Sequence, residues 1–285
     1  MGTARGRGMD LLVDADILAC QFAYAYEARR GGGGTRAIVD ADMMDPEARD
    51  DWLRTDGRWA IAGFDSAVER MLRETRTDKA ILCFTGSENF RYAILSTYKA
   101  NRRGQPRPVL LDALIDHAQQ AWECRSEDSL EADDVMGIMA TKSPRRYVMA
   151  STDKDLKQVP GVHYNWRTGC MERVTTPDAD YWFYFQVLTG DSTDNYSGCP
   201  GVGPRRAKTV LDSTDADPWA SIVAAFESKG LSEEDALTQA RMARILRCID
   251  YDFEQRRPIL WRPSCARERL LEDSIQSARS IMPGQ

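Results

Sequence analysis

Short apolar runs alternate with amphipathic segments along the first two thirds of this 285-residue chain. Three of the runs, Leu11–Val13, Ala80–Phe84 and Tyr147–Ala150, are bounded by polar residues, as buried parallel strands are. Apolar residues at helical spacing predict helices at about 64–75, 108–124 and 129–141. Strands that alternate with helices predict an α/β fold, with a parallel sheet flanked by helices.

The pattern changes after about residue 180, where helical spacing dominates and glycine and proline mark the joints. The helices predicted here cover Tyr181–Thr189, Pro204–Leu211, Pro218–Lys229 and Glu233–Tyr251. We therefore expect two parts, an α/β domain over 9–180 and a helical region over 181–285.

Composition narrows the class of protein. Hydrophobic residues make up 42% and charged residues 29% of the chain, which is typical of a soluble globular protein. No apolar run approaches the roughly 20 residues that span a bilayer, so we expect no membrane contact. The seven cysteines form no CxxC pair, which predicts free thiols in a reducing cytoplasm rather than a zinc site. Residues 28–57 are rich in glycine and acids and predict a surface excursion.

Acidic residues gather at places that the predicted topology brings together. Asp14 follows the first strand, Asp153 and Asp155 follow the third, and further acids lie in the segments LEADDV and TGDSTDN. Ligand sites of open α/β sheets lie outside the carboxyl ends of the strands. The acids of these segments that could meet there are Asp14, Glu131, Asp133, Asp134, Asp153, Asp155, Asp191 and Asp194.

Each acidic segment alone has an ordinary interpretation as a turn, a helix cap or a partner of a helix dipole. Together, these carboxylates would repel one another, and hard cations such as Mg²⁺ or Mn²⁺ relieve that repulsion. Two such ions about 3.5–4 Å apart suit the hydrolysis of a phosphodiester. Without these eight charges the formal net charge changes from -6 to +2, so the remaining surface suits a polyanion.

Two further segments favour a nucleic-acid partner. Residues 90–108 interleave cations with aromatic residues, which suits phosphates and bases, although a solvated helix with core aromatics shows the same pattern. Residues 198–211, GCPGVGPRRAKTVL, place glycines before a proline at a helix start, where free N–H groups bind phosphate. A packing joint between two helices is the alternative for this segment. The candidate DNA-binding residues are Arg91, Tyr98, Lys99, Arg102, Arg103, Gly201, Gly203, Arg205, Arg206 and Lys208.

In this order, the segments resemble the 5′-nuclease superfamily, which includes flap endonucleases, the 5′–3′ exonuclease domain of bacterial DNA polymerase I and bacteriophage 5′–3′ exonucleases. The matching blocks are LLVDAD, YKANR, EADD, STDKD, GDSTDN and PGVG, and they span about residues 10–211. With a compact helical tail and no polymerase region, the chain is most similar to a stand-alone phage-type enzyme.

The resemblance implies a PIN-like catalytic domain followed by a helix-hairpin-helix (H3TH) subdomain. It implies that the eight acids hold two Mg²⁺ or Mn²⁺ ions, that Lys99 and Arg102 contact the scissile phosphate, and that Gly201 and Gly203 grip duplex DNA beside a K⁺ ion. The residues that it makes catalytic are Lys99, Arg102, Asp14, Glu131, Asp133 and Asp153.

The activity that the resemblance implies is 5′–3′ exonuclease or flap endonuclease cleavage of DNA in replication or repair. We expect a monomer in the cytoplasm of a bacterium or a phage-infected cell, with an RNA–DNA hybrid as a further candidate substrate. Two alternatives stay open, which are a non-catalytic binder of branched DNA and a PIN-type ribonuclease that would not need the PGVG hairpin.

The chain departs from the family at one place. Many members carry an acid just after the second strand, whereas residues 81–88 read ILCFTGSE. Glu88 is the only acid in that stretch, so one metal position is expected to have fewer charged ligands. Asp16 is a less favoured ligand than Asp14, because the family uses the first acid after the strand. The departure is the one feature that favours the non-catalytic alternative.

Overall fold

The computed structural model describes residues 8–29, 57–144, 146–213 and 217–263. The prediction of a surface excursion over 28–57 falls mostly on residues 30–56, which lie outside the described residues. No helix in the described part of the chain is long and apolar enough to cross a membrane.

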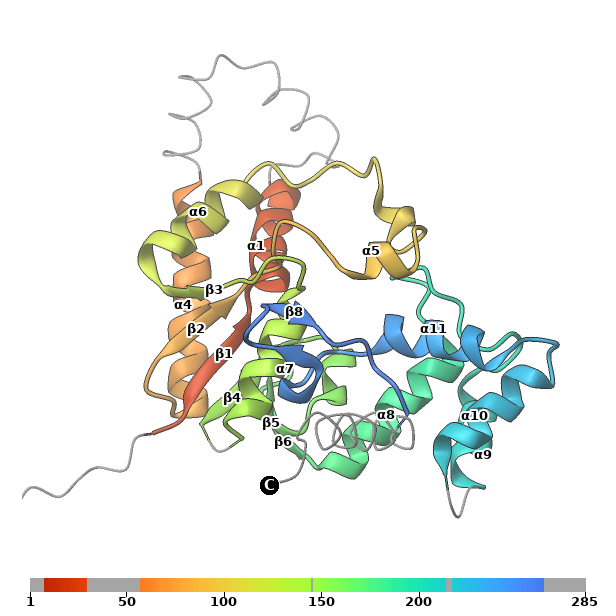
Figure 1. Cartoon of the computed structure of the whole chain (residues 1–285). Coiled ribbons are helices and arrows are strands. Elements are labelled where there is room, and N and C mark those ends of the chain that lie inside the picture. Colours follow the sequence, from red (N-terminus) through yellow and green to blue (C-terminus); the bar gives the residue numbers. More distant parts are fainter. Residues whose placement is uncertain (1–7, 30–56, 145, 214–216, 264–285) are drawn as a thin grey trace, which may run out of the picture.

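Within these residues a six-stranded sheet runs through the centre of the α/β part (Figure 1). In order across the sheet, its strands are β3 (Glu123–Arg125), β2 (Ala80–Cys83), β1 (Asp10–Asp14), β4 (Tyr147–Ala150), β5 (Gly161–Asn165) and β6 (Cys170–Val174). Neighbouring strands pair in parallel except for β5 and β6, which are antiparallel. The three predicted strands are confirmed. The predicted parallel sheet is confirmed as mostly parallel, with β6 as an antiparallel edge strand. The largely exposed side chains of β6 explain why no apolar run marked it.

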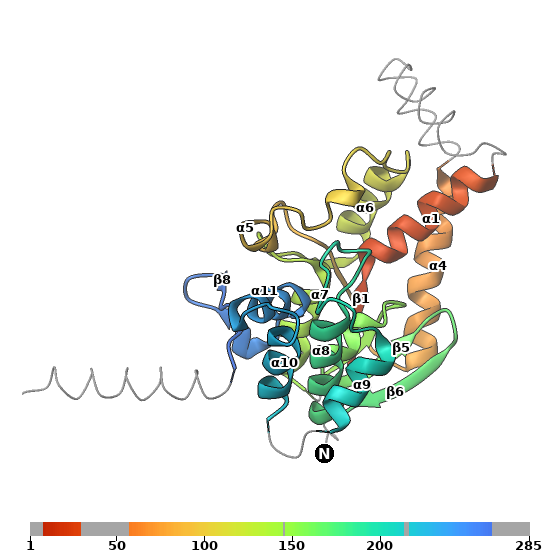
Figure 2. The ribbon, with the colours of Figure 1, turned by 90° about the vertical axis from the view of Figure 1, so that its right-hand side faces the viewer.

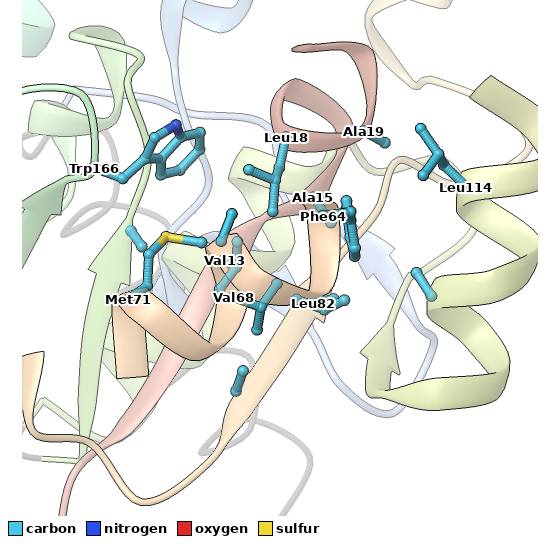
Figure 3. Packing of buried hydrophobic residues seen from close by; sticks show 14 of the residues in the cluster. Val13, Ala15, Leu18, Ala19, Phe64, Val68, Met71, Leu82, Leu114 and Trp166 are labelled. Carbon is cyan, nitrogen blue, oxygen red and sulfur yellow. The ribbon is translucent and has the colours of Figure 1, made fainter. Parts of the chain in front are cut away.

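Alternate residues of the central strands face two separate cores. Leu11 and Val13 belong to the core on one face, whereas Leu12 belongs to the core on the other. The first core is covered by α1 (Ala15–Arg29), α4 (Arg58–Thr75) and α6 (Leu111–Ala121). Leu18, Phe64 and Leu114 of these helices belong to the same core as Val13 and Leu82 of the sheet (Figure 3). The second face is covered by α7 (Ala132–Lys142).

Helix α1 was not predicted, because alanines and large apolar residues lie all around it and hide the helical period. Helix α4 begins at Arg58, six residues before the predicted start at 64. The predicted helix over 108–124 is corrected at its end, where Glu123–Arg125 forms the edge strand β3.

The helical region is formed by α8 (Thr176–Thr189), α9 (Pro204–Asp212), α10 (Pro218–Glu227) and α11 (Glu233–Ala243). These helices share a core that includes Phe183, Ile222 and Phe226. Figures 1 and 2 show the group lying away from α1 and α4. Helix α8 starts before the predicted residue 181, because a capping box of Thr175 and Asp178 fixes its first turn. The boundary between 180 and 181 falls inside this helix, and the division into two domains stays a prediction.

The last predicted helix, Glu233–Tyr251, is corrected by the structure, in which α11 ends at Ala243. The chain then turns extended at Arg244, which lets the backbone N–H of Leu246 donate to Asp134 at 3.0 Å. Arg244 itself forms an ion pair with buried Asp250 at 2.7 Å. Tertiary hydrogen bonds therefore replace the continued helix. A short hairpin, β7 (Tyr251–Asp252) and β8 (Arg257–Pro258), follows.

Candidate active site

A cavity of about 690 Å³ lies at the carboxyl ends of β1 and β4, where the sheet meets the helical region. Seven of the eight predicted acids line it, and they are Asp14, Glu131, Asp133, Asp153, Asp155, Asp191 and Asp194. Lys99 and Arg102 line the same cavity. The structure therefore brings most of the predicted site residues together from segments far apart in sequence.

A serine joins the ends of the two central strands. Asp14, at the end of β1, is 2% exposed and accepts a hydrogen bond from the Ser151 hydroxyl at 2.8 Å and one from the Ile17 N–H at 3.2 Å. The Ser151 oxygen also accepts from the Asp153 N–H at 3.0 Å, and the Asp155 N–H donates to Asp153 at 2.8 Å. Ser151 was not among the predicted site residues, although its place directly after a strand was a usable signal.

Five of the acids have no cationic partner in the part of the chain that the structure describes. This uncompensated group consists of Asp14, Asp133, Asp153, Asp155 and Asp191. No lysine or arginine of the described residues forms an ion pair with any of them. Burial raises the pKa of Asp14 to about 7, and Asp16 and Asp153 add to the effect. Burial and the charges of Asp14 and Asp153 raise the pKa of Asp133 well above its usual range.

Asp155 and Asp191 form a coupled pair within the uncompensated group. Burial, the charge of Asp153 and hydrogen bonding to Asp191 raise the pKa of Asp155 to about 7. Burial would also raise the pKa of Asp191, but hydrogen bonds from Thr193 and Asp155 lower it below its usual value. Without a cation, the pair is therefore stable near neutral pH when it keeps a proton.

Two further acids are surrounded by cations, and we call Glu131 and Asp194 the compensated pair. Lys99 donates to Glu131, and Arg102 forms an ion pair with Asp194 at 2.7 Å. The Tyr98 hydroxyl bridges both acids, at 2.8 Å from Glu131 and 3.0 Å from Asp194.

The cations around the compensated pair act against the effect of burial. Burial would raise the pKa of Glu131, but Arg91 and Lys99 outweigh it and lower the pKa to about 2. Burial would lower the pKa of Lys99, but Glu131 and Asp194 raise it, so the ammonium stays charged. Burial still raises the pKa of Asp194 despite Lys99 and Arg102. The YKANR block therefore faces the acids before any substrate is bound.

The structure corrects the prediction that Asp134 is a metal ligand. Its side chain is fully buried, does not line the cavity and forms a two-bonded ion pair with Arg91 at 2.7 and 2.9 Å. It also accepts from the Leu246 N–H and caps its own helix by accepting from the Glu131 N–H at 3.2 Å. Spacing along the helix suggested that Glu131 and Asp134 share a face, but the capping bond turns Asp134 toward the core.

Two predicted DNA contacts are corrected for a related reason. Arg91 is 3% exposed, and besides Asp134 it binds the carbonyl oxygens of Met242 and Arg244. The Tyr98 ring is 1% exposed, so it is not available to stack on a base. Both residues are buried and hold acids of the site through hydrogen bonds, so neither faces the solvent.

The other predicted DNA contacts lie on the surface. Arg103, Arg205, Arg206 and Lys208 are exposed, and Gly203 begins α9 without a side-chain cap. Gly201 has a φ of +73°, in the left-handed region that favours glycine. The first N–H groups of α9 are therefore open to a ligand, as the hairpin prediction requires.

Two glycines that the sequence analysis did not single out shape the loop carrying Asp191 and Asp194. Gly190 and Gly198 have φ values of +65° and +62°. A Cβ on Gly190 would lie 2.4 Å from the Ser197 carbonyl carbon, and one on Gly198 would lie 2.3 Å from the Gly190 nitrogen. Only glycine fits at both positions, and their close approach closes the loop.

The residues present fit divalent cations in a particular way. One oxygen of Asp155, Oδ1, is buried without a hydrogen-bond partner among the described residues. The pKa values of Asp14, Asp133 and Asp155 are raised, and a bound cation would lower them. No three acidic, histidine or cysteine side chains of the described residues form a ligand set for an ion on their own. Mg²⁺ commonly uses one or two carboxylates and completes its octahedron with water and substrate phosphate, so this open arrangement suits it.

These features together define an α/β nuclease. They are the acidic edge of the sheet, the lysine and arginine beside it, and the glycine hairpin at the start of a helix. A family model described as the 5′–3′ exonuclease N-terminal resolvase-like domain matches residues 49–179. The exonuclease of Escherichia phage T7 is 34% identical over 64% of this chain and 73% of its own length. The flap endonuclease Xni of Vibrio campbellii is 32% identical over 70% of this chain and 84% of its own length. The chain therefore belongs to the 5′–3′ exonuclease family and is a 5′ nuclease.

Solved structures confirm the fold class. The T5 D15 protein co-crystallised with metal ions has a TM-score of 0.60 at 14% identity, covering 82% of this chain and 88% of that one. The T5 D15 flap endonuclease in a pseudo-enzyme–product complex with DNA and metal ions has a TM-score of 0.55 at 14% identity, covering 82% and 88%.

Proposed function

We propose that this chain is a divalent-metal-dependent enzyme that hydrolyses phosphodiester bonds at DNA 5′ ends, as a 5′–3′ exonuclease or flap endonuclease. The observation that carries the proposal is the uncompensated group, five acids in one cavity without a cationic partner among the described residues. Acids in a buried cluster destabilise one another unless protons or cations bind them. The 5′ nucleases among the relatives support the choice of substrate.

The proposed cofactors are two Mg²⁺ or Mn²⁺ ions held by the uncompensated group, with Glu131 and Asp194 beside them. When bound, these ions would activate water and neutralise charge on the scissile phosphate. Lys99 and Arg102 would exchange their present carboxylate partners for phosphate oxygens and stabilise the charge that develops there. Ser151 would hold Asp14 and the backbone of Asp153 in place for that chemistry.

The proposed DNA contacts lie on the hairpin and on α9. The open N–H groups at Gly203 and Arg205 would bind phosphates of the duplex, with the side chains of Arg206 and Lys208 adding charge. A K⁺ ion at the hairpin carbonyls belongs to this proposal. The DNA complex of the T5 flap endonuclease, which shares the fold, is consistent with a DNA substrate.

The setting that we propose is DNA replication or repair in the cytoplasm of a bacterium or a phage-infected cell, with the protein acting as a monomer. An RNA–DNA hybrid is a further proposed substrate.

The test uses a 5′-overhang duplex and a 5′-flap substrate, each labelled at both ends. The protein is incubated with Mg²⁺, with EDTA, and with Mg²⁺ as the Asp153→Asn variant. Release of 5′ nucleotides or flaps that needs Mg²⁺ and is lost in the variant supports the proposal and shows which mode dominates. Tight DNA binding without cleavage in Mg²⁺ or Mn²⁺ would instead establish the non-catalytic binder.

A further inference from the structure

One acid of the cavity has no part in the mechanism described above. Asp16 lies in the first turn of α1, two residues beyond Asp14, and lines the cavity. Its Oδ2 atom accepts hydrogen bonds from the Thr85 backbone N–H at 3.0 Å and from the Thr85 hydroxyl at 2.5 Å. No hydrogen bond from a described residue reaches its other oxygen, Oδ1.

Thr85 holds this acid in one orientation. The Thr85 oxygen accepts a hydrogen bond from the N–H of Ala132, the first residue of α7, at 3.2 Å. A hydroxyl has a single proton, and here that proton is donated to Asp16. Asp16 is therefore tied both to the end of β2 and to the start of α7, beside the helix turn that carries Glu131 and Asp133.

An ordinary role as a helix cap does not explain this arrangement. An acid that stabilises the start of a helix accepts from the N–H groups of that helix. In α1 this bond is made by Asp14, which accepts from the Ile17 N–H at 3.2 Å. The bonded oxygen of Asp16 instead turns across the sheet edge to Thr85, a residue 69 positions away.

The ends of the central strands show what this orientation supplies. Three adjacent strands, β2, β1 and β4, end at the cavity. Asp14 is the last residue of β1 and Asp153 follows β4, whereas β2 is followed by the uncharged Thr85. Glu88, the first acid after β2, is exposed and does not line the cavity.

We propose that Asp16 is a further carboxylate of the metal site, with Oδ1 facing a cation or one of its waters, and that Thr85 is its positioning residue. A carboxylate from α1 thus serves the end of β2, which has no acid of its own. The proposal rests on the proposed function, because it assumes that the cavity binds divalent cations.

The experiment measures Mn²⁺ affinity of the full chain without DNA, by electron paramagnetic resonance of free Mn²⁺. Asp16→Asn is expected to weaken binding by at least about 10-fold, and Thr85→Val by about 10-fold, since loss of a partner that orients a ligand typically costs 10–100-fold. Thr85→Ser keeps the hydroxyl and is expected to bind as the unchanged protein does. Glu69→Gln, an exposed acid on α4, is the matched control and is expected to change nothing.

Exchanging the side chains at positions 16 and 85 tests whether the place of the carboxylate matters, separately from whether the variant folds. Asp16→Thr alone is expected to lose affinity, and combining it with Thr85→Asp is expected to restore most of it, because the same two groups meet with their roles reversed. Thermal unfolding in EDTA shows whether each variant is folded.

Unchanged Mn²⁺ affinity in Asp16→Asn, with affinity lost in Asp153→Asn, would overturn the role of Asp16 and leave the proposed function standing. Loss in Asp16→Asn without rescue by the exchange would overturn the positional argument. Absence of Mn²⁺ binding by the unchanged protein would overturn the proposed function itself, and the role of Asp16 with it.

Discussion

The compensated pair and the uncompensated group share one cavity but differ in how their charge is balanced. Glu131 is neutralised by Arg91 and Lys99, which lower its pKa to about 2. Asp14 and Asp155, in the same cavity, have pKa values raised to about 7 by burial and by neighbouring acids. Protein cations thus complete one half of the site and leave the other half with unbalanced charge.

The difference indicates that one part of the site is neutralised by the protein itself, whereas the other part is arranged to bind cations. A protein that needed only stability would pair all its buried acids, since unpaired buried charge is costly. The uncompensated group keeps that cost, and divalent cations are the partners that would remove it. The compensated pair holds Lys99 and Arg102 in ion pairs beside the place where a substrate phosphate would bind.

The largest expected effect comes from removing one acid of the uncompensated group. Asp153→Asn is expected to reduce cleavage of a 5′-overhang duplex by about 1000-fold, the loss typical of a group that stabilises developing charge. DNA affinity, measured in EDTA by fluorescence anisotropy, should change little, because the basic hairpin is untouched. Glu69→Gln is the control. Cleavage within 10-fold of the unchanged protein would contradict the metal assignment.

Two adjacent acids of α7, Asp133 and Asp134, allow the paired and unpaired carboxylates to be compared by their effect on stability. Asp134→Asn removes the nearer of the two ion-pair partners of buried Arg91 and leaves only Glu131 at 3.1 Å, so it is expected to lower the free energy of unfolding by about 3 kcal/mol. Asp133→Asn removes a repelling charge and should not lower it in EDTA. Urea denaturation in EDTA at pH 7 measures both variants. Equal loss of stability in the two would show that the distinction between these neighbouring acids is wrong.

The cations of the compensated pair should affect chemistry more than metal binding. Lys99→Met is expected to lower kcat by about 100-fold, since it removes one stabilising charge from the phosphate. Mn²⁺ affinity should stay within a few-fold, because Lys99 neutralises Glu131 rather than the uncompensated group. Single-turnover cleavage and Mn²⁺ titration give the two readouts. A large loss of Mn²⁺ affinity with unchanged kcat would reverse the roles.

The raised pKa values in the uncompensated group also predict a dependence of stability on pH in EDTA. Asp14 and Asp155 have raised pKa values, so the native state keeps protons that the unfolded chain has released above about pH 4. The free energy of unfolding should therefore fall as pH rises from about 4 to 7, by at most about 1.4 kcal/mol per pH unit for each group. Saturating Mg²⁺ should flatten this slope. Urea denaturation at several pH values tests it, and the same slope with and without Mg²⁺ would count against cation binding at these acids.

Much of the fold and of the site was predictable from local sequence. Three strands marked by apolar runs are confirmed, and seven of the eight predicted acids line one cavity. Acids that directly follow parallel strands must meet at one sheet edge, so the topology alone places Asp14 near Asp153. The edge strands β3 and β6 were missed, because their side chains are half-exposed or exposed and leave no apolar run.

The sequence by itself determined the class of site, since strand ends and ordered acidic blocks depend on neighbours only a few residues apart. The tertiary structure decided which acids are neutralised. Asp134 is paired with Arg91, 43 positions away, and Asp16 is held by Thr85, 69 positions away. The charge state of a buried carboxylate depends on the groups within a few ångströms of it, and spacing along the chain does not specify those groups.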